Sequence, residues 1–285
     1  MTTHATSPTL VGGHRSEFGQ TVRADRWWVG PLLTILGLGG FIVYSTWAAL
    51  QGEHYWAGSY LSPLYSPVLF VDQSVPGAAP LAHAVFGTWP EWWPGFLPAS
   101  PAVFILVFPG AFRATCYYYR KAYYRSFFGT PPGCAVCPVK QRDYRGETRL
   151  LAVQNLHRYA LYFAILFIVI LTYDAVISMW REVGGEMKFG VGVGTLVLFV
   201  NAALLGCYTF GCHSLRHLVG GRRDRFTSAG TPTLTHRIWQ KVSWLNARHM
   251  LFAWLSLFWV GFTDFYVRMV SMGYFNDLNT WGAAG

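Results

Sequence analysis

Long apolar runs separated by polar loops dominate the pattern of this chain. Five runs of roughly 20 residues are nearly free of charged side chains; they cover residues 29–50, 101–119, 156–180, 189–212 and 247–270. An α-helix of that length spans the hydrocarbon core of a bilayer, which is about 30 Å thick. The pattern therefore predicts an all-α integral membrane protein with five transmembrane helices. The second run is the least regular, because Arg113 lies inside it.

Basic residues are concentrated in alternate loops. Lys and Arg are absent from 51–100 and from the tail past 270, whereas 120–149 holds seven of them and 213–243 holds six. Loops rich in Lys and Arg stay on the cytoplasmic side. We therefore expect a cytoplasmic N-terminal tail at 1–28 and a five-helix domain at 29–285, with a periplasmic segment at 51–100 and the C-terminus outside. This is a multi-pass protein of the cell inner (plasma) membrane.

Composition supports the same class. The chain is 53% hydrophobic and 12% charged, against about 25% charged residues in ordinary globular domains. The formal charge of +9 is divided between loops beside the spans, so it indicates topology and not a nucleic-acid partner. Four of the five cysteines fall on the reducing cytoplasmic side, which argues against a disulfide framework.

Two stretches of the chain resemble one another. Each has Cys-x3-Arg at the end of an apolar run, then Asn followed by adjacent His and Arg, and later Thr with Asp close behind. The first stretch contains Cys116, Asn155, His157 and Asp174, and the second contains Cys212, Asn246, His249 and Asp264. The match predicts that helices 2–3 and 4–5 form a tandem parallel repeat. Asn155 and Asn246 are of a type that caps helix N-termini.

The repeat brings two thiols and two imidazoles to one level of the predicted bundle. Metal-binding side chains at membrane depth usually face the interior of the bundle. A Rieske-type 2Fe-2S cluster has two Cys and two His ligands, and Cys116, Cys212, His157 and His249 match that number. His213, His217 and Cys134 are reserve ligands, and Cys134-x-x-Cys137 also reads as half of a zinc site. The alternative cofactor is haem b held between His157 and His249.

A quinone site needs hydrogen-bond donors at the edge of an apolar cleft. Five side chains at the expected depth offer such groups: Arg113, Tyr117, Arg158, Trp244 and Arg248. A cofactor-free anchor or transporter is a third possibility, in which Arg113, Asp174 and Asp264 line a solute path. Both aspartates then carry protons, or they only cap the outer ends of their helices.

Several segments carry a family resemblance: CYYYRKAYYRSF, QNLHRY, GCHSLRH, LNARHM and TDFYV. They resemble the membrane-anchor (cytochrome b-like) subunit of actinobacterial succinate dehydrogenase with a single five-helix anchor. The resemblance implies a subunit of succinate:quinone oxidoreductase that has flavoprotein and iron–sulfur partners, lies in the lipid membrane and passes electrons to menaquinone or ubiquinone. It also implies a b-type haem or a Rieske-like cluster, no succinate-oxidising site in this chain, and an assembly that can form a higher oligomer.

Overall fold

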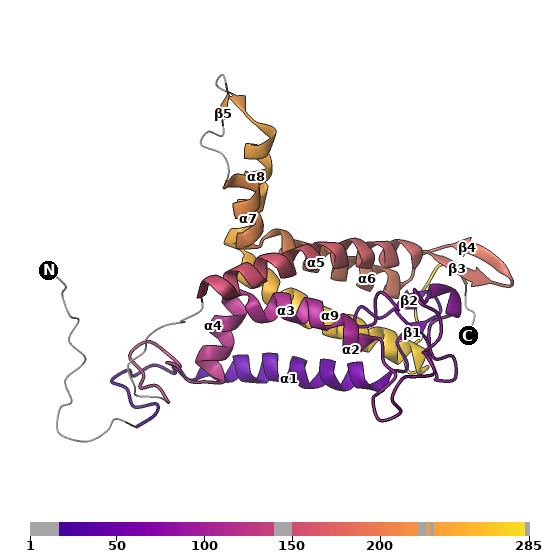
Figure 1. Cartoon of the computed structure of the whole chain (residues 1–285), viewed down its shortest axis with the longest axis horizontal. Helices are drawn as coiled ribbons and strands as arrows, with labels where there is room; N and C mark the ends of the chain where they lie inside the picture. The colour runs from indigo at the N-terminus through magenta and orange to yellow at the C-terminus, as the bar shows by residue number, and fades with distance from the viewer. Residues whose placement is uncertain (1–16, 140–149, 222–226, 229–230, 283–285) are drawn as a thin grey trace. The chain divides into compact units, whose positions relative to one another are not determined.

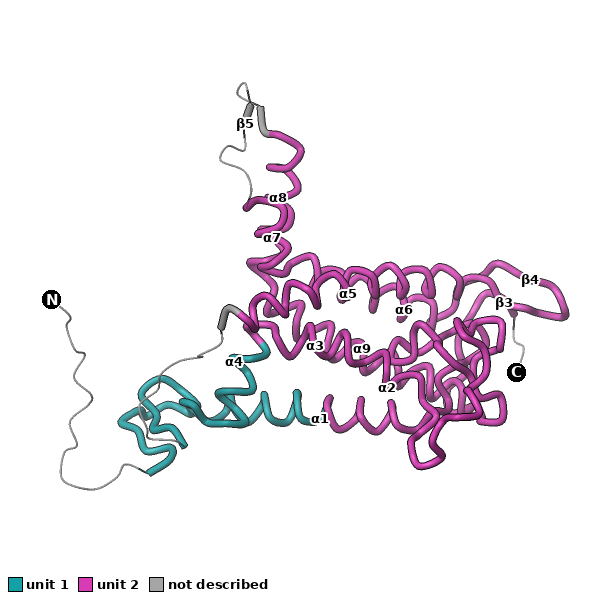
Figure 2. The backbone as a smooth tube through the Cα atoms, in the orientation of Figure 1, with its two compact units in different colours: residues 1–40, 119–148 teal, residues 41–118, 149–285 magenta. Residues whose placement is uncertain are grey.

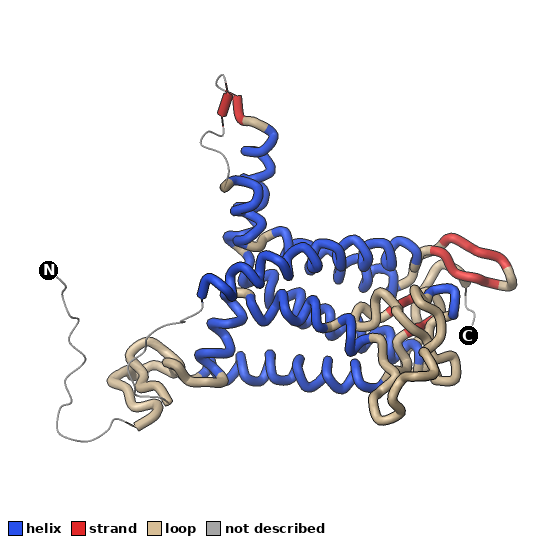
Figure 3. The backbone as a smooth tube through the Cα atoms, in the orientation of Figure 1, coloured by secondary structure: helices blue, strands red, loops and turns tan. Residues whose placement is uncertain are grey.

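The computed structural model describes residues 17–139, 150–221, 227–228 and 231–282. The chain falls into two compact units, coloured separately in Figure 2: residues 1–40 with 119–148, and residues 41–118 with 149–285. Helices make up most of the described chain, and strands form short hairpins (Figure 3). The mostly helical architecture agrees with the predicted all-α membrane class.

Four helices of the described chain are long and apolar enough to cross a membrane: α1 (Val29–Gln51), α5 (Leu150–Ile177), α6 (Val193–Phe210) and α9 (His249–Ser271). They overlap the first, third, fourth and fifth predicted runs. The predicted caps are wrong. Asn155 lies inside α5, and Asn246 lies inside α8 (Leu234–Ala247), where its side-chain amide donates to the Gly211 carbonyl at 2.8 Å.

The second predicted run is a broken helix. It consists of α2 (Ala102–Ile105) and α3 (Val107–Thr115), followed after Cys116 by α4 (Tyr117–Ser126). Pro109 has no N–H to donate to the Ile105 carbonyl, which explains the break between α2 and α3. The described residues therefore contain four helices that could span a membrane, or five if this bent series counts as one.

The first unit joins the N-terminal segment to the loop after α4. Gly19 N–H donates to the Cys137 carbonyl at 3.1 Å, Cys137 N–H donates to the Gln20 carbonyl at 3.0 Å, and Thr21 forms an isolated bridge with Val136. Residues 17–28 of the predicted tail therefore belong to this unit. The remainder of that tail, residues 1–16, lies outside the described residues.

In the second unit, α6 packs against α5 and α9, and α3 packs against α5 (Figure 1). At one end of this bundle, α7 (His213–Gly220) pairs with α8 as a helical hairpin. The smaller elements are β1 (Trp56–Ala57), β2 (Tyr60–Leu61), η1 (Leu81–His83), β3 (Trp180–Val183), β4 (Glu186–Phe189), β5 (Thr227–Ser228) and β6 (Thr231–Pro232).

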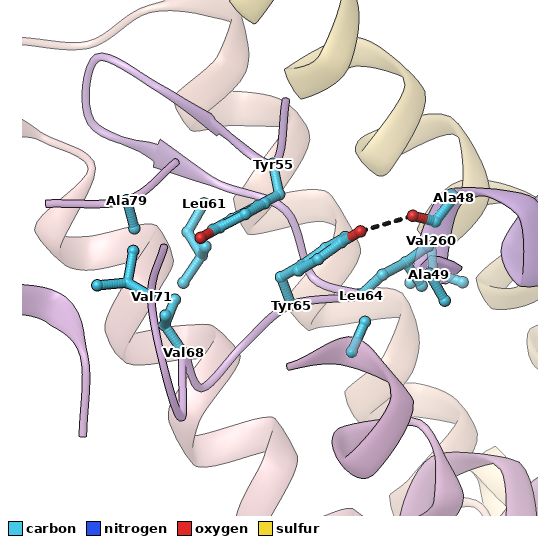
Figure 4. Close-up of a cluster of buried hydrophobic side chains, with 11 residues drawn as sticks. Ala48, Ala49, Tyr55, Leu61, Leu64, Tyr65, Val68, Val71, Ala79 and Val260 are labelled. Carbon is cyan, nitrogen blue, oxygen red and sulfur yellow. Dashed lines mark hydrogen bonds between the residues drawn. The ribbon is translucent and has the colours of Figure 1, made fainter. Parts of the chain in front are cut away.

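The segment predicted to lie outside, 51–100, supplies most of a buried hydrophobic cluster that Ala48 and Ala49 of α1 and Val260 of α9 complete (Figure 4). Tyr55 and Tyr65 stack with ring centroids 4.4 Å apart, and the Tyr65 hydroxyl donates to the Ala48 carbonyl of α1 at 2.6 Å. Burying two aromatic rings contributes several kcal/mol. The segment is thus anchored to the end of α1.

Candidate functional site

Cys116 and Cys212 occupy the same kind of backbone position. Each is an extended residue between two helices, with φ −64° and ψ 133° at Cys116 and φ −63° and ψ 137° at Cys212. Each backbone amide donates to the carbonyl three residues earlier: Cys116 N–H donates to the Arg113 carbonyl at 3.1 Å, and Cys212 N–H donates to the Thr209 carbonyl at 3.2 Å. The extended residue ends one helix and starts the next, and it leaves both thiols buried.

The cysteines and histidines meet in crossed pairs. His157 Nε2 lies 3.1 Å from Cys212 Sγ, and His249 Nε2 lies 3.7 Å from Cys116 Sγ. Each cysteine therefore contacts the histidine of the other of the two similar stretches. Both imidazoles are buried. The structure brings the four residues that were predicted as ligands together as two Cys–His pairs.

A hydroxyl group fixes the orientation of His157. The Thr115 Oγ1 donates to the Ala111 carbonyl at 2.7 Å and lies 2.9 Å from His157 Nδ1. Since the hydroxyl proton is used by Ala111, Thr115 accepts from Nδ1–H. His157 Nε2 then carries the lone pair, and it is this nitrogen that faces Cys212. Metal-binding histidines typically donate their second N–H in this way.

Two aromatic rings cover the imidazoles. Phe112 stacks on His157 with 4.7 Å between ring centroids, and Tyr208 stacks on His249 with 4.8 Å between them. The rings of Phe112 and Tyr208 meet edge to face, with their centroids 5.3 Å apart. Phe112 and Tyr208 each lie four residues before a cysteine. The repeated i, i+4 spacing puts ring and cysteine on one helix face, and comparison of the two stretches at that spacing could have identified both rings from the sequence.

The donor chemistry suits a soft metal centre. Thiolate and imidazole are the ligands used by zinc and by iron–sulfur clusters. For a tetrahedral metal with bonds of about 2.3 Å to sulfur and about 2.1 Å to nitrogen, the two donors lie about 3.6 Å apart, close to the 3.1 and 3.7 Å of the crossed pairs. No three His, Cys, Asp or Glu side chains of the described residues form one closed group. The four donors are two pairs.

The reserve ligands lie elsewhere. His213 and His217 are exposed on α7, and their ring centroids lie 4.8 Å apart. Desolvation, followed by the charges of His217 and Arg216, lowers the pKa of His213. Cys134 is exposed and belongs to the other unit of the chain.

One of the five candidate quinone ligands lies beside the crossed pairs. Arg113 donates to the Ala253 carbonyl at 3.3 Å and to Ser256 Oγ at 3.1 Å, and its guanidinium lies 4.9 Å from the Tyr208 ring centre. The other four candidates, Tyr117, Arg158, Trp244 and Arg248, are exposed. The structure thus places the Arg113 guanidinium over the Tyr208 ring, which itself stacks on the imidazole of His249.

The two aspartates hold segment 51–100, the segment predicted to lie outside and called the outer segment below, by its serines. Asp264 accepts hydrogen bonds from Tyr44 at 2.6 Å and from Ser62, and Arg268 lies 3.6 Å away. Asp174 accepts from Ser66. Neither serine was predicted, because nothing in the sequence pairs a loop serine with a distant helix.

Known proteins match the chain over most of its length. Residues 29–273 match the family described as actinobacterial succinate dehydrogenase subunit SdhC. A chain of the solved Mycobacterium smegmatis Sdh1 complex in the apo form is 40% identical. That match covers 95% of this chain and 98% of the other, with a TM-score of 0.78. No curated protein matches. The resemblance found in the sequence is confirmed, and the chain belongs to the family of actinobacterial succinate dehydrogenase subunit SdhC.

Proposed function

We propose that this chain anchors the flavoprotein and iron–sulfur subunits of succinate dehydrogenase to the membrane and passes electrons from the iron–sulfur subunit to quinone. Family membership and the similar chain in an Sdh1 complex support this role. The apolar helices supply the anchor. Oxidation of succinate then belongs to the partner subunits. By the distribution of basic residues, the N-terminus is cytoplasmic and the C-terminus lies outside.

The electron-transfer centre that we propose is a 2Fe-2S cluster bound by Cys116, Cys212, His157 and His249. The observation that carries this assignment is the crossed pairing, which sets a buried sulfur against a buried imidazole nitrogen twice. When bound, such a cluster is a one-electron carrier whose potential is raised by its histidine ligands. Cys116, Cys212, His157 and His249 would hold this Rieske-type cluster, with each cysteine lying beside one histidine.

The residues around the pairs have separate tasks in this proposal. Thr115 orients His157 so that its Nε2 is the nitrogen that would bind the metal. Phe112 and Tyr208 exclude water from the imidazole faces. Arg113 offsets the negative charge that two thiolates bring into a low-dielectric site. The fixed cation also makes uptake of an electron more favourable nearby.

We also propose that the crossed pairing reflects duplication. The shared backbone geometry of Cys116 and Cys212, and an aromatic ring four residues before each, support a tandem repeat of helices 2–3 and 4–5. Binding sites at the interface of such repeats are common in membrane proteins.

Haem b between His157 and His249 is supported less well. Each imidazole Nε2 faces a sulfur, and an aromatic side chain covers one face of each ring. A bis-histidine haem needs both Nε2 atoms to point at one iron. A cofactor-free transporter is also supported less well, because Asp264 is committed to Tyr44, Ser62 and Arg268.

The test is spectroscopy of the purified complex. We expect iron and acid-labile sulfide beyond the needs of the iron–sulfur subunit, an additional 2Fe-2S signal in the reduced-state EPR spectrum, and no b-type α band. Cys116→Ser and Cys212→Ser should each abolish that signal. Cys207→Ser, on α6 but outside the crossed pairs, should keep it. Retention of the signal in both ligand variants would exclude our assignment.

A further inference from the structure

A cavity opens beside Asp174 at the end of α5 that lies next to the outer segment. It is lined by apolar residues of 51–100, including Val68 and Val85, together with Trp56, His83, Tyr173 and Asp174. Seventeen residues separate Asp174 from His157 on α5, which is about 25 Å at 1.5 Å per residue. The ligand of this cavity is therefore not in contact with the Cys–His pairs.

The second aspartate shows what such a carboxylate binds in this protein. Asp264 accepts from a loop serine, Ser62, and is neutralised by Arg268 four residues later on the same helix. The Arg268 guanidinium also lies over the Trp47 ring at 5.2 Å. The arrangement combines a buried carboxylate, a serine donor, a cation and an aromatic face.

Asp174 resembles Asp264 in its serine donor and nearby aromatic rings, but it is only partly buried and, in the described part of the chain, lacks the cation. Ser66 donates to its carboxylate, and Trp56, His83 and Tyr173 provide aromatic walls. The residue four positions later is Ser178. Among the described residues, no Lys or Arg lies within ion-pair distance of Asp174.

Nearby groups do not neutralise this carboxylate. Arg181 packs against Gly58 and is not among the residues that line the cavity. Burial lowers the pKa of His83, so its ring is neutral at pH 7 and can accept a hydrogen bond. A carboxylate with one histidine is too small a set for a metal ion, and no group of three such ligands occurs in the described part of the chain.

We propose that this cavity binds an ammonium group, and that the natural source is the headgroup of an outer-leaflet lipid such as phosphatidylethanolamine. An ammonium ion matches a carboxylate by charge and aromatic rings by cation–π attraction. Tyr173 is 63% exposed and Val85 is 58% exposed, so the rim is accessible from the lipid side. Assignment to the outer leaflet rests on the topology in the proposed function; binding of the ammonium group does not.

The experiment uses the intact complex in nanodiscs of phosphatidylglycerol with increasing phosphatidylethanolamine, and native mass spectrometry counts the lipids that stay bound. We expect preferential retention of phosphatidylethanolamine and a loss of about tenfold in Asp174→Asn, which equals about 1.4 kcal/mol. Glu91→Gln is the matched control: it removes the same charge from an exposed site of the outer segment and should retain the lipid as the wild type does.

A second variant separates binding from folding. Tyr173→Leu keeps the carboxylate and changes one exposed aromatic wall, and it should weaken retention about threefold, as expected for an exposed cation–π contact. Soluble ethanolamine and tetramethylammonium separate the sources. Displacement of the lipid by either probe supports ammonium recognition, and binding of ethanolamine without lipid preference assigns a free amine. Equal retention of both lipids by the wild type together with no binding of ethanolamine, or unchanged retention in Asp174→Asn, overturns the proposal. These readouts do not depend on the EPR signal.

Discussion

Arg268 and Asp264 form a buried ion pair on α9, and replacing the arginine should destabilise the protein strongly. Their side chains are 1% and 0% exposed, with 3.6 Å between Arg268 Nε and Asp264 Oδ2. At an effective dielectric constant of about 20, unit charges at that separation attract by about 4.6 kcal/mol. Arg268→Met leaves the Asp264 carboxylate buried without a cation, which destabilises proteins by about 3–5 kcal/mol. We expect that loss in the free energy of unfolding.

The assay is a double-mutant cycle on the purified complex, with unfolding in SDS–detergent mixtures followed by tryptophan fluorescence. Asp264→Asn should also destabilise, because it leaves the guanidinium buried. The double variant should recover about 2–3 kcal/mol relative to the sum of the single changes. Arg237→Met, at an exposed position of α8, should stay within about 0.5 kcal/mol of the wild type. Additive losses in the cycle would show that the pair is not coupled.

Three further predictions concern the site and its support. Thr115→Val removes the acceptor for the histidine of α5 and should weaken cluster binding about 10–100-fold, measured as iron content, whereas Thr115→Ser should restore it. Arg113→Gln removes a positive charge from the site that holds the Tyr208 and His249 rings and should lower the midpoint potential by about 30–60 mV in an EPR redox titration. A Cβ on Gly194 would lie 2.5 Å from the Tyr60 ring, whereas the nearest atom at Gly206 is 3.7 Å away. Gly194→Ala should therefore destabilise by about 1–3 kcal/mol in thermal unfolding, and Gly206→Ala should not.

Each of these predictions has a contrary result. Full iron content in Thr115→Val would mean that the hydroxyl does not orient the ligand. An unchanged or raised potential in Arg113→Gln would separate the guanidinium from the redox centre. Equal stability of the two glycine variants would contradict the close approach of α6 to Tyr60.

The spans and the candidate ligands were predictable from the sequence, because both depend on local patterns. Apolar runs located four membrane helices, and the repeat aligned Cys116 with Cys212 and His157 with His249. The crossed partners were not predictable. Which cysteine meets which histidine depends on how α3, α5, α6 and α9 pack, and spacing along one helix carries no information about its neighbours.

Helix boundaries and single polar contacts were also beyond the sequence. The cap prediction at Asn155 was wrong because α5 continues through a polar turn and begins at Leu150. The sequence does not distinguish Thr115 from other threonines, because its role depends on a contact with His157, 42 residues away. Ser62 and Ser66 lie in a Pro-rich loop. Only the folded structure shows that Ser62 donates to Asp264 and Ser66 to Asp174.

Nitrogen hyperfine spectroscopy of the reduced complex tests the central claim most directly. With histidine labelled by nitrogen-15, we predict two histidine nitrogens coupled to the cluster spin, and loss of one coupling in each of His157→Ala and His249→Ala, or of the whole signal if the cluster is lost. Their relative strengths would also show whether the two histidines share an iron. A 2Fe-2S signal without any histidine coupling, or one unchanged by both substitutions, would contradict the account.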